Sequence, residues 1–494
     1  MSSMGTQTYD VAIIGAGPVG TTLANFLGLL GISTVILERE DKGYHLPRAV
    51  ACDDEIMRIF QAAGLAQEVG AVMEPGLGAL FVDALGRTLV HWRRPQERNE
   101  NGYFANYRFH QPRLEQVLRD GLERFDCVDL IWGWDAKGFV QTPDHVEISG
   151  DQSGEPQLIR AKYLVGADGG RSFTREALGI QNEDLGFHEP WLIVDVILNE
   201  EDPDQDRNTN HFCGGKRMGS KIFVGLDRKR WEFRLNPGDD PETIGRPEKV
   251  WPMLEEWITP DEGQLERTTV YTFHSTIAES WRAGRVFIAG DAAHQTPPFM
   301  GQGMCAGIRD ANNLAWKLAA VLRGQAPDAL LDTYETERKP HVRKYIELTI
   351  DLGHLINRTR DEISGDLVSK REAGGQQLAQ LRPLIGPGLS AGETGLRGKV
   401  FPQFRATSAK NSDDQSGDYP TLYVGGEVSP ELAGQFAGSG VNLRQADREI
   451  RGWLELAGAA GVLVRPDRAV LGHVTGLERI AELLPKNWRF AAEE

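Results

Sequence analysis

The feature that most constrains the fold of this chain is a glycine-rich turn near its N-terminus. A G-x-G-x-x-G pattern at residues 15–20 directly follows the β-branched run 9–14 and opens a helical stretch at 18–30. A second apolar strand pattern follows at 33–37. This order predicts a βαβ unit, whose two strands are parallel and joined by a right-handed crossover.

Each position of the turn has a physical role in binding the diphosphate of a dinucleotide. Gly15 permits the tight turn, Gly17 lets the backbone approach the diphosphate, and Gly20 allows close packing of helix on strand. The helix N-terminus adds free N–H groups and partial positive charge. Glu38, at the end of the second strand, is placed to accept hydrogen bonds from ribose hydroxyls. Such a turn also arises for packing alone, but strand, helix and acidic residue together predict dinucleotide binding.

Two strand-rich segments interrupt the alternation of strands and helices. An Ala-Leu-Gly-Arg turn joins strand patterns in the first, and several apolar strand patterns occur in the second. We therefore predict a Rossmann-like α/β domain with an inserted β-sheet domain. The α/β domain comprises residues 1–80, 104–186 and 272–375, and the β-sheet domain comprises 81–103 and 187–271.

The C-terminal part has a different composition. Residues 376–415 are rich in Gly, Pro, Ser and polar residues, which indicates a linker or a loosely packed connection. Strand patterns at 421–424 and 461–465 flank a helical pattern at 443–456, so we expect a short α/β tail domain at 416–494.

Charge and cysteine placement exclude several classes of protein. Lys and Arg total 54 against 71 Asp and Glu, and the net charge of −17 repels nucleic acid and anionic lipid. The four cysteines form no CxxC or Cys/His cluster, which argues against a redox dithiol and a zinc site. No secretory signal and no apolar stretch long enough to span a bilayer is visible. We expect a cytoplasmic protein without metal, nucleic-acid or membrane partners.

Two further stretches carry a family resemblance. Residues 163–172 (YLVGADGGRS) and 290–294 (GDAAH), the latter continuing through 297–304 (PPFMGQGM), resemble the paired signatures of the class A flavoprotein monooxygenases, the p-hydroxybenzoate hydroxylase family. The resemblance covers roughly residues 8–350 in the correct order and spacing. It implies FAD as the bound cofactor and NAD(P)H as the reductant.

The second of these stretches also has a direct physical interpretation. Asp291 follows an apolar strand, so its carboxylate emerges where a ribityl chain can be hydrogen-bonded. Gly301, Gly303 and Met304, at the start of a helix, can present N–H donors to the flavin pyrimidine. Pro298, with its neighbouring proline, forms a rigid wall without donors beside the ring. The alternatives are a plain turn and a stiffened loop.

Other cofactor contacts follow from the resemblance alone. Arg48, in Leu46-Pro47-Arg48-Ala49, is expected to contact the FAD diphosphate, and Gln111 is expected to hydrogen-bond the cofactor. Asp168 and Arg171 look like the motif that serves both FAD and the transient nicotinamide. Alternatively, Arg48 is a surface cation, Asp168 a helix N-cap and Arg171 part of a solvent ion pair.

No second strand–glycine–helix pattern appears after Gly20. This argues against reductases and Baeyer–Villiger-type enzymes, which have separate Rossmann sites for FAD and NADPH. The reductant is therefore expected to dock without a Rossmann domain of its own.

Finer resemblance points to the 3-(3-hydroxyphenyl)propionate hydroxylase branch of the family. The stretches that carry it are 297–314, 47–49 with 53–55, and 230–233 (RWEF). Residues 462–468 (VLVRPDR) are similar to the end of the thioredoxin-like domain that those enzymes append, which makes the expected tail thioredoxin-like.

The resemblance implies hydride transfer from NAD(P)H to FAD, formation of a flavin hydroperoxide from dioxygen, and hydroxylation of a phenolic aromatic acid. The protein must exclude water, orient the ring and help the phenol lose its proton. The resemblance makes the inserted sheet the substrate-binding domain. The candidates are His211 and Tyr271 for catalysis and Trp191, Phe212, Arg230 and Phe299 for substrate binding, with His188, Arg217 and, beside the flavin motif, His294 as further options. A His or aromatic residue in a sheet more often serves packing, His294 can hydrogen-bond its own loop, and the two arginines can equally be surface residues.

Two other functions keep every FAD motif. One is another FAD oxidoreductase on the same scaffold, such as an epoxidase, dehalogenase or dehydrogenase; the other is a non-catalytic flavin-binding interaction protein. The partners expected are a small aromatic substrate and dioxygen, with a homodimer as one option.

Overall fold

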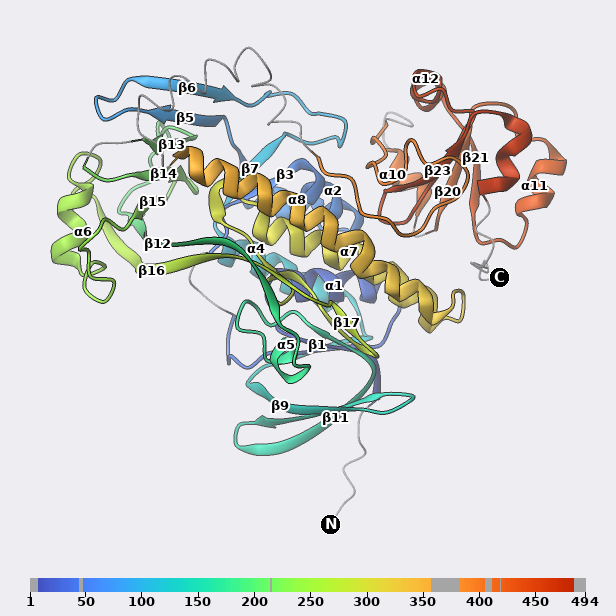
Figure 1. The fold of residues 1–494 in the computed structure, drawn as a ribbon, viewed down its shortest axis with the longest axis horizontal. Coiled ribbons are helices and arrows are strands. Elements are labelled where there is room, and N and C mark those ends of the chain that lie inside the picture. Colours follow the sequence, from blue (N-terminus) through green and yellow to red (C-terminus); the bar gives the residue numbers. More distant parts are fainter. Residues whose placement is uncertain are drawn as a thin grey trace.

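The computed structural model describes residues 8–43, 48–213, 216–356, 382–404, 411–417 and 419–483. Three bodies are visible in Figure 1: an α/β body at the centre and bottom, a β-sheet body at the upper left, and a separate C-terminal body at the upper right. Leu46 and Pro47, as well as 376–381 and 405–410 of the predicted linker, lie outside the described residues.

The α/β body is built on a mostly parallel sheet. Its order is β17-β18-β11-β1-β2-β8, and the four pairs from β18 to β8 are parallel. The βαβ unit predicted from the glycine turn is therefore confirmed. Off this order, β10 (Val146–Gln152) pairs with β11, and β9 (Trp134–Gln141) pairs with β10. The other strands of the sheet are β1 (Thr8–Ile14), β2 (Thr34–Leu37), β8 (Val128–Ile131), β11 (Glu155–Gly166), β17 (Arg282–Ala283) and β18 (Val286–Ile288).

Long helices cover one face of this sheet. α1 and α7 pack against each other, and α7 and α8 cross the middle of the molecule (Figure 1). Leu23, Ile36 and Leu314 are among the fully buried apolar residues between these helices and the sheet. The helices of this body are α1 (Pro18–Leu29), α2 (Asp54–Ala62), α3 (Ala66–Gly70), α4 (Gln111–Asp120), α5 (Phe173–Ala177), α7 (Gln302–Leu322) and α8 (Thr333–Ile356).

The two strand-rich segments, together with β19 from the stretch after β18, form one eight-stranded sheet with the order β19-β16-β12-β15-β14-β13-β5-β6. They meet where β13 pairs in parallel with β5. α6 (Pro247–Leu254) covers one face of the sheet, with Val250 and Leu254 packed on Trp231 and Phe233. The strands are β5 (Gly78–Val82), β6 (Thr88–Arg93), β12 (Asn182–Leu198), β13 (Asn208–Phe212), β14 (Gly219–Phe223), β15 (Arg228–Arg234), β16 (Gly263–Ala278) and β19 (His294–Gln295).

A small sheet connects these two bodies. β7 (Asn106–Phe109) lies between β3 (Ala51–Asp53) and β4 (Met73–Pro75) and is antiparallel to both. Cys52, Tyr107 and Phe109 on these strands are buried in the core of the α/β body.

The C-terminal body has the strand order β21-β20-β22-β23, with β20 parallel to β21 and the other pairs antiparallel. Together with α11 (Pro430–Phe436) and α12 (Arg448–Leu456), this is the βαβ–ββ arrangement of a thioredoxin-like domain. The helix predicted from residue 443 is wrong in its first turn, because Asn442–Gln445 form β21. The other strands are β20 (Thr421–Val424), β22 (Gly461–Val464) and β23 (Val470–Val474), preceded by the short α10 (Ser412–Ser416).

Buried ion pairs fasten the C-terminal body to the α/β body. Arg58 on α2 donates two hydrogen bonds to Asp413, and Arg465 donates two to Glu337 on α8. Between these contacts, Phe401 is 1% exposed. The prediction of a linker or a loosely packed connection at 376–415 stays a prediction.

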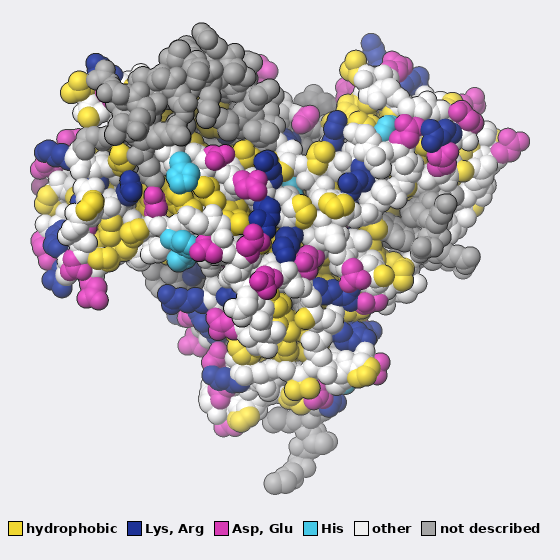
Figure 2. Space-filling view, viewed as in Figure 1, with side chains coloured by type: hydrophobic (Ala, Val, Ile, Leu, Met, Phe, Trp, Pro, Cys, Tyr) yellow, Lys and Arg dark blue, Asp and Glu magenta, His cyan; other side chains and the backbone are white. Residues whose placement is uncertain are grey.

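Charges of both signs are interspersed on the face of the molecule seen in Figure 2. Among the described residues, no helix is both long enough and apolar enough to cross a membrane.

Candidate active site

A cavity of about 2420 Å³ opens at the carboxyl ends of the parallel strands. Gly15 follows β1, Glu38 follows β2, Asp168 follows β11 and Asp291 follows β18, and all four line the cavity. In open α/β sheets, ligands bind at this edge. Sites for one small molecule measure roughly 300–1,000 Å³, so this cavity has room for a dinucleotide and a second molecule.

The glycine turn leaves space for a diphosphate. Gly15 has a φ of 105°, and a Cβ there would lie 2.5 Å from the carbonyl oxygen of Ala167. A Cβ on Gly20 would lie 2.1 Å from the carbonyl oxygen of Gly15. At Gly17 a Cβ would meet nothing within 4 Å. Gly15 and Gly20 are thus required by the protein itself, whereas the space at Gly17 faces the cavity.

Glu38 is held at the carboxyl end of β2. Its Oε2 accepts a hydrogen bond of 2.7 Å from the backbone N–H of Ala16, and its Oε1 accepts one of 3.1 Å from that of Glu40. The carboxylate therefore bridges the glycine turn and the second strand, in the position where a ribose binds in this type of fold.

Gln111 reaches the cavity but is bonded to the protein. Its Oε1 accepts hydrogen bonds from the backbone N–H groups of Arg48 and Ala49, and its Nε2 donates to Glu115. Its side chain thus fixes the loop that carries Arg48. Arg48 also lines the cavity.

Asp168 and Arg171 lie on the loop after β11. The carboxylate of Asp168 accepts hydrogen bonds from the Ser172 hydroxyl and the Thr174 backbone N–H, so it stabilises the start of α5. Arg171 is exposed and lines the cavity.

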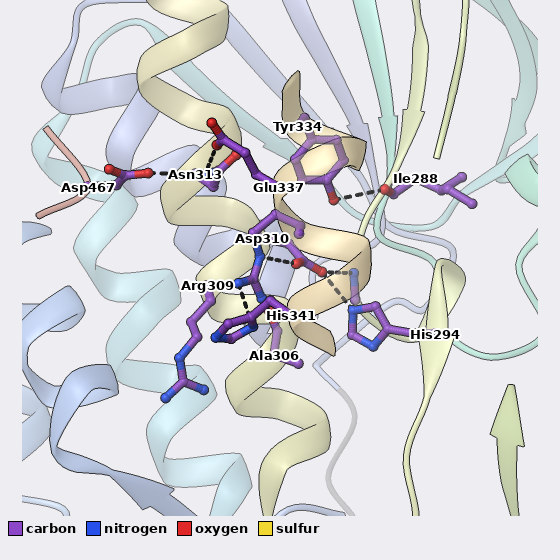
Figure 3. A network of polar contacts seen from close by, with 12 residues as sticks. Ile288, His294, Ala306, Arg309, Asp310, Asn313, Tyr334, Glu337, His341 and Asp467 are labelled. Atoms are coloured by element: carbon purple, nitrogen blue, oxygen red, sulfur yellow. Dashed lines mark hydrogen bonds and ion pairs between the residues drawn. The ribbon is translucent and has the colours of Figure 1, made fainter. Parts of the chain in front are cut away.

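Asp291 presents a carboxylate without a hydrogen-bond partner among the described residues. Burial raises its pKa. Asp310 on α7 fixes the loop that carries Asp291. Its Oδ2 accepts a hydrogen bond from the Gly290 N–H and pairs with Nε2 of His294. Figure 3 shows Asp310 on α7 between His294 and side chains of α8.

The N-terminus of α7 points its free N–H groups at the same cavity. Gly301, with a φ of 64°, precedes the helix, and no side chain caps it. At Gly303 a Cβ would meet nothing within 4 Å. Pro298, Gly301, Gly303 and Met304 all line the cavity. A helix N-terminus of this kind stabilises negative charge.

These residues fit FAD on structural grounds. One end of the cavity has an open glycine turn at a helix N-terminus, which suits a diphosphate. Near the other end, the unpartnered Asp291 carboxylate suits a hydroxyl chain, and the uncapped α7 suits an electron-poor ring. Among the described residues, no group of three or more His, Cys, Asp or Glu is placed to hold a metal ion.

The second sheet forms the other wall. His211 on β13 is buried and lines the cavity, and its Nδ1 lies 2.7 Å from the Ser220 hydroxyl. Burial, with Arg108 nearby, lowers the pKa of His211 to about 4, so its imidazole is neutral at pH 7. Tyr271 also lines this wall and is 44% exposed.

The aromatic residues predicted to bind the substrate lie on both faces of the second sheet, and only one face meets the cavity. Phe299 lines the cavity, with Trp191 packed behind it at a ring distance of 5.5 Å. Phe212 faces the other side and stacks on Trp257 at 5.1 Å, because neighbouring residues of a strand point to opposite faces. Its assignment to the substrate wall is therefore corrected.

The two cations predicted to bind a substrate carboxylate, Arg230 and Arg217, are bonded to protein groups. Arg230 lines the cavity, but it is 1% exposed and donates to Asp195 and to the carbonyl oxygen of Arg48. Arg217 pairs with Asp239 and is not among the residues lining the cavity. His188 contacts His274 and Asp184 on the exposed side of the β12–β16 pair.

Among the charged residues of the cavity wall that the sequence did not predict are Arg94, Arg108 on β7, Glu232 on β15 and Arg267 on β16. Burial raises the pKa of Glu232. The only sequence signal was a charged residue set between apolar ones, as in Tyr107-Arg108-Phe109.

Comparison with known proteins gives consistent matches. A family model described as an FAD binding domain matches residues 8–349. A protein of Rhodococcus jostii (strain RHA1), named probable NADH-specific resorcinol 4-hydroxylase, is 39% identical over 81% of this chain and 75% of its own. Hydroxylases named for 3-(3-hydroxy-phenyl)propionate and 3-hydroxycinnamic acid match as well. The one from Mycobacterium avium (strain 104) is 36% identical over 84% of this chain and 71% of its own, and the one from Mycolicibacterium smegmatis is 39% identical over 72% and 62%.

Solved structures share the fold over nearly the whole chain. The rebeccamycin biosynthetic enzyme RebC with reduced flavin matches with a TM-score of 0.81 at 23% identity, covering 97% of this chain and 99% of that one. Aklavinone-11 hydroxylase with FAD and aklavinone matches with a TM-score of 0.80 at 24% identity, covering 97% and 100%.

Proposed function

This chain belongs to the flavoprotein family whose FAD binding domain spans its residues 8–349, and from that premise we propose that it hydroxylates a phenolic aromatic acid with FAD, NAD(P)H and dioxygen. The family relatives named above act on resorcinol and on 3-(3-hydroxy-phenyl)propionate, which are both phenols.

One observation carries the proposal. A single cavity joins the glycine turn, the loop after Asp291 and a polar wall on the second sheet. A cofactor held at both its ends would therefore have its ring facing a compartment large enough for an aromatic substrate.

We assign the cofactor contacts residue by residue. Gly15 and Gly17 with the N-terminus of α1 would hold the diphosphate together with Arg48, Gly20 would let α1 pack against the turn, and Glu38 would bind the ribose. Asp291 would bind the ribityl chain, and the N–H groups at Gly301, Gly303 and Met304 would face the pyrimidine. When bound, FAD accepts a hydride from NAD(P)H and activates dioxygen so that one oxygen atom is transferred to an electron-rich ring.

The remaining work falls to side chains of the chain itself. Pro298 and Phe299 would form an apolar wall that orients the aromatic ring and excludes water from it. In the tautomer whose Nδ1–H donates to Ser220, Nε2 of His211 can accept a hydrogen bond from the phenol. That hydrogen bond draws the proton away from the phenol oxygen, which raises the electron density of the ring and makes it a better nucleophile. Tyr271 stands at the more exposed part of the same wall.

The reductant is proposed to dock without a nucleotide-binding domain of its own, near Arg171 and Asp168. We favour NADH, because the Rhodococcus relative is named NADH-specific. The domain limits expected from the sequence, a cytoplasmic location and a homodimer all remain proposals.

The proposal is tested by adding a panel of phenols and phenylpropanoids to the purified yellow protein and measuring the rate of flavin reduction by NADH. Acceleration by phenolic acids supports it. Equal rates with and without every phenol would favour another flavin chemistry on this scaffold.

A further inference from the structure

Arg108 carries a hydrogen-bond donor that the protein does not use. It lies on β7, between the α/β body and the second sheet, and lines the cavity. One Nη2–H donates to the Thr209 hydroxyl at 2.6 Å. Its Nε is shielded inside the protein, whereas Nη1 is not among the enclosed atoms and has no hydrogen-bond partner in the part of the chain that the structure describes. Because Arg108 lines the cavity, this unbonded Nη1 group can donate to a bound ligand.

The charges around this donor favour an anion. Arg94 and Glu232, which also line the cavity, both act on Arg108. Glu232 is itself close to Arg267 and to Arg230, which is paired with Asp195. Burial lowers the pKa of Arg108 to about 10, and Arg94 nearby acts in the same direction, so the guanidinium is still charged at pH 7. A further cation here would be repelled, whereas a carboxylate would form charge-assisted hydrogen bonds.

The two cations that the sequence suggested for a carboxylate are both bonded to protein groups. Arg230 is held in a bidentate contact by Asp195 and also bonds the carbonyl oxygen of Arg48. Arg217 lies outside the cavity lining and is paired with Asp239.

The position of Arg108 relative to His211 fits a small phenolic acid. Thr209, to which Arg108 is bonded, and His211 are two residues apart on β13 and line the cavity on the same face. Two residues along a strand span roughly 7 Å. A phenol hydroxyl at His211 and a carboxylate at Arg108 would therefore be separated by an aromatic ring and a short linker.

We propose that Arg108 is the specificity-determining residue that binds the carboxylate of the aromatic acid through the Nη N–H groups that are not bonded to Thr209. The identity of the aromatic ring in this proposal rests on the proposed function. The binding of an aromatic carboxylate to Arg108 can nevertheless be measured without turnover.

The experiment compares two probes of the same shape, 3-(3-hydroxyphenyl)propionate and its primary amide. Their binding to the FAD-loaded enzyme is followed by the change in flavin absorbance, and their KM and kcat are measured in NADH-dependent turnover. Wild-type enzyme should bind the acid more tightly than the amide. Arg108→Gln should raise the Kd and KM for the acid about 10- to 100-fold and change those for the amide less than about 3-fold, since one charge-assisted contact is lost.

Two further variants make the result specific. Arg108→Lys should recover part of the affinity for the acid, because it restores the charge without the planar fork. Arg217→Gln is the control, because Arg217 lies outside the cavity lining, and it should leave both probes unchanged. If Arg108→Gln does not load FAD, Thr209→Val, which frees Arg108 from its anchor, replaces it and should weaken the acid selectively.

The outcomes separate the two claims. Equal effects of Arg108→Gln on acid and amide, or a wild-type enzyme that prefers the amide, would overturn the role of Arg108 while leaving phenol hydroxylation intact. Tight, Arg108-dependent binding of the acid without turnover would uphold Arg108 and contradict the proposed function. Failure of the acid to bind at all would overturn the role of Arg108.

Discussion

The imidazole Nε2 of His294 lies 2.7 Å from Oδ2 of Asp310, and both side chains are fully shielded from solvent. The same oxygen accepts a hydrogen bond from the Gly290 N–H, and Oδ1 accepts one from Arg338 on α8. Two helices thereby fix the loop whose next residue, Asp291, faces the cavity (Figure 3). The geometry of the cofactor loop depends on a buried charge that is far from it in sequence.

Replacing Asp310 by Asn tests this anchor. The substitution leaves Arg338 buried without its anion, so we expect the free energy of unfolding to fall by about 3–5 kcal/mol and FAD to bind more weakly. Urea titration followed by flavin fluorescence measures both effects. Glu347→Gln, in an exposed pair with Lys344, should change stability by less than about 0.5 kcal/mol. An Asp310→Asn protein that matches the wild type in both measurements would contradict the anchoring role.

Alanine substitutions in the glycine turn should separate an effect on folding from an effect on FAD binding. Gly20→Ala places a methyl group against the carbonyl oxygen of Gly15, so it should destabilise the fold and reduce the yield of soluble protein. Gly17→Ala meets no protein atom, so the apoprotein should keep its melting temperature. Because that methyl group enters the space assigned to the diphosphate, FAD affinity should nevertheless fall about 10-fold or more. Calorimetry of the apoprotein and titration with FAD distinguish the two; unchanged affinity in Gly17→Ala would place the diphosphate elsewhere.

His211 gives a prediction about pH. Its pKa is lowered to about 4, mainly by burial, whereas an unfolded His titrates near 6.5. Between these values the unfolded state binds more protons, so the contribution of His211 to stability falls as the pH drops from about 6.5 to about 4. His211→Gln should make stability less dependent on pH in this window. In NMR spectra of the wild-type protein, the His211 ring should show no titration between pH 5.5 and 8; a midpoint near 6.5 would contradict its buried environment.

Cysteine reactivity tests the core. Burial raises the pKa of the Cys52 and Cys305 thiols strongly and that of Cys213 to about 11, so few thiolates form near neutral pH. In the native protein, Cys127, which is only partly buried, should be the first to react with a thiol reagent such as DTNB. Cys127→Ser should remove this fast phase, and denaturation should expose every remaining thiol. Rapid reaction of Cys305 in the folded holoenzyme would indicate that the start of α7 is open to solvent.

The local part of this architecture was accessible from sequence. The glycine turn, its two strands and Glu38 are consecutive in the chain, and their spacing determines the βαβ geometry directly. Asp291 was identified because it follows a buried strand, and such positions lie at the carboxyl edge of a parallel sheet.

Contacts between distant segments were not accessible in the same way. Sequence shows that His211 and Phe212 point to opposite faces of a strand, but it does not show which face meets the cavity, because that depends on pairing with β14 and β5. Arg108 was missed because its role arises from β7 crossing beside Thr209, about a hundred residues later in the chain. The start of the predicted helix at 443 was wrong because residues 441–444 (VNLR) alternate between apolar and polar, as a short strand does, shortly before the helix begins.

Incorporation of isotopic oxygen tests the central claim most directly. The FAD-loaded protein is given NADH, ¹⁸O₂ and 3-(3-hydroxyphenyl)propionate, and the product is analysed by mass spectrometry. A hydroxylase of this class should consume NADH faster when the phenol is present and should yield an aromatic product that has gained a single ¹⁸O atom. NADH consumption that the phenol does not accelerate, or a product without ¹⁸O, would contradict the assignment.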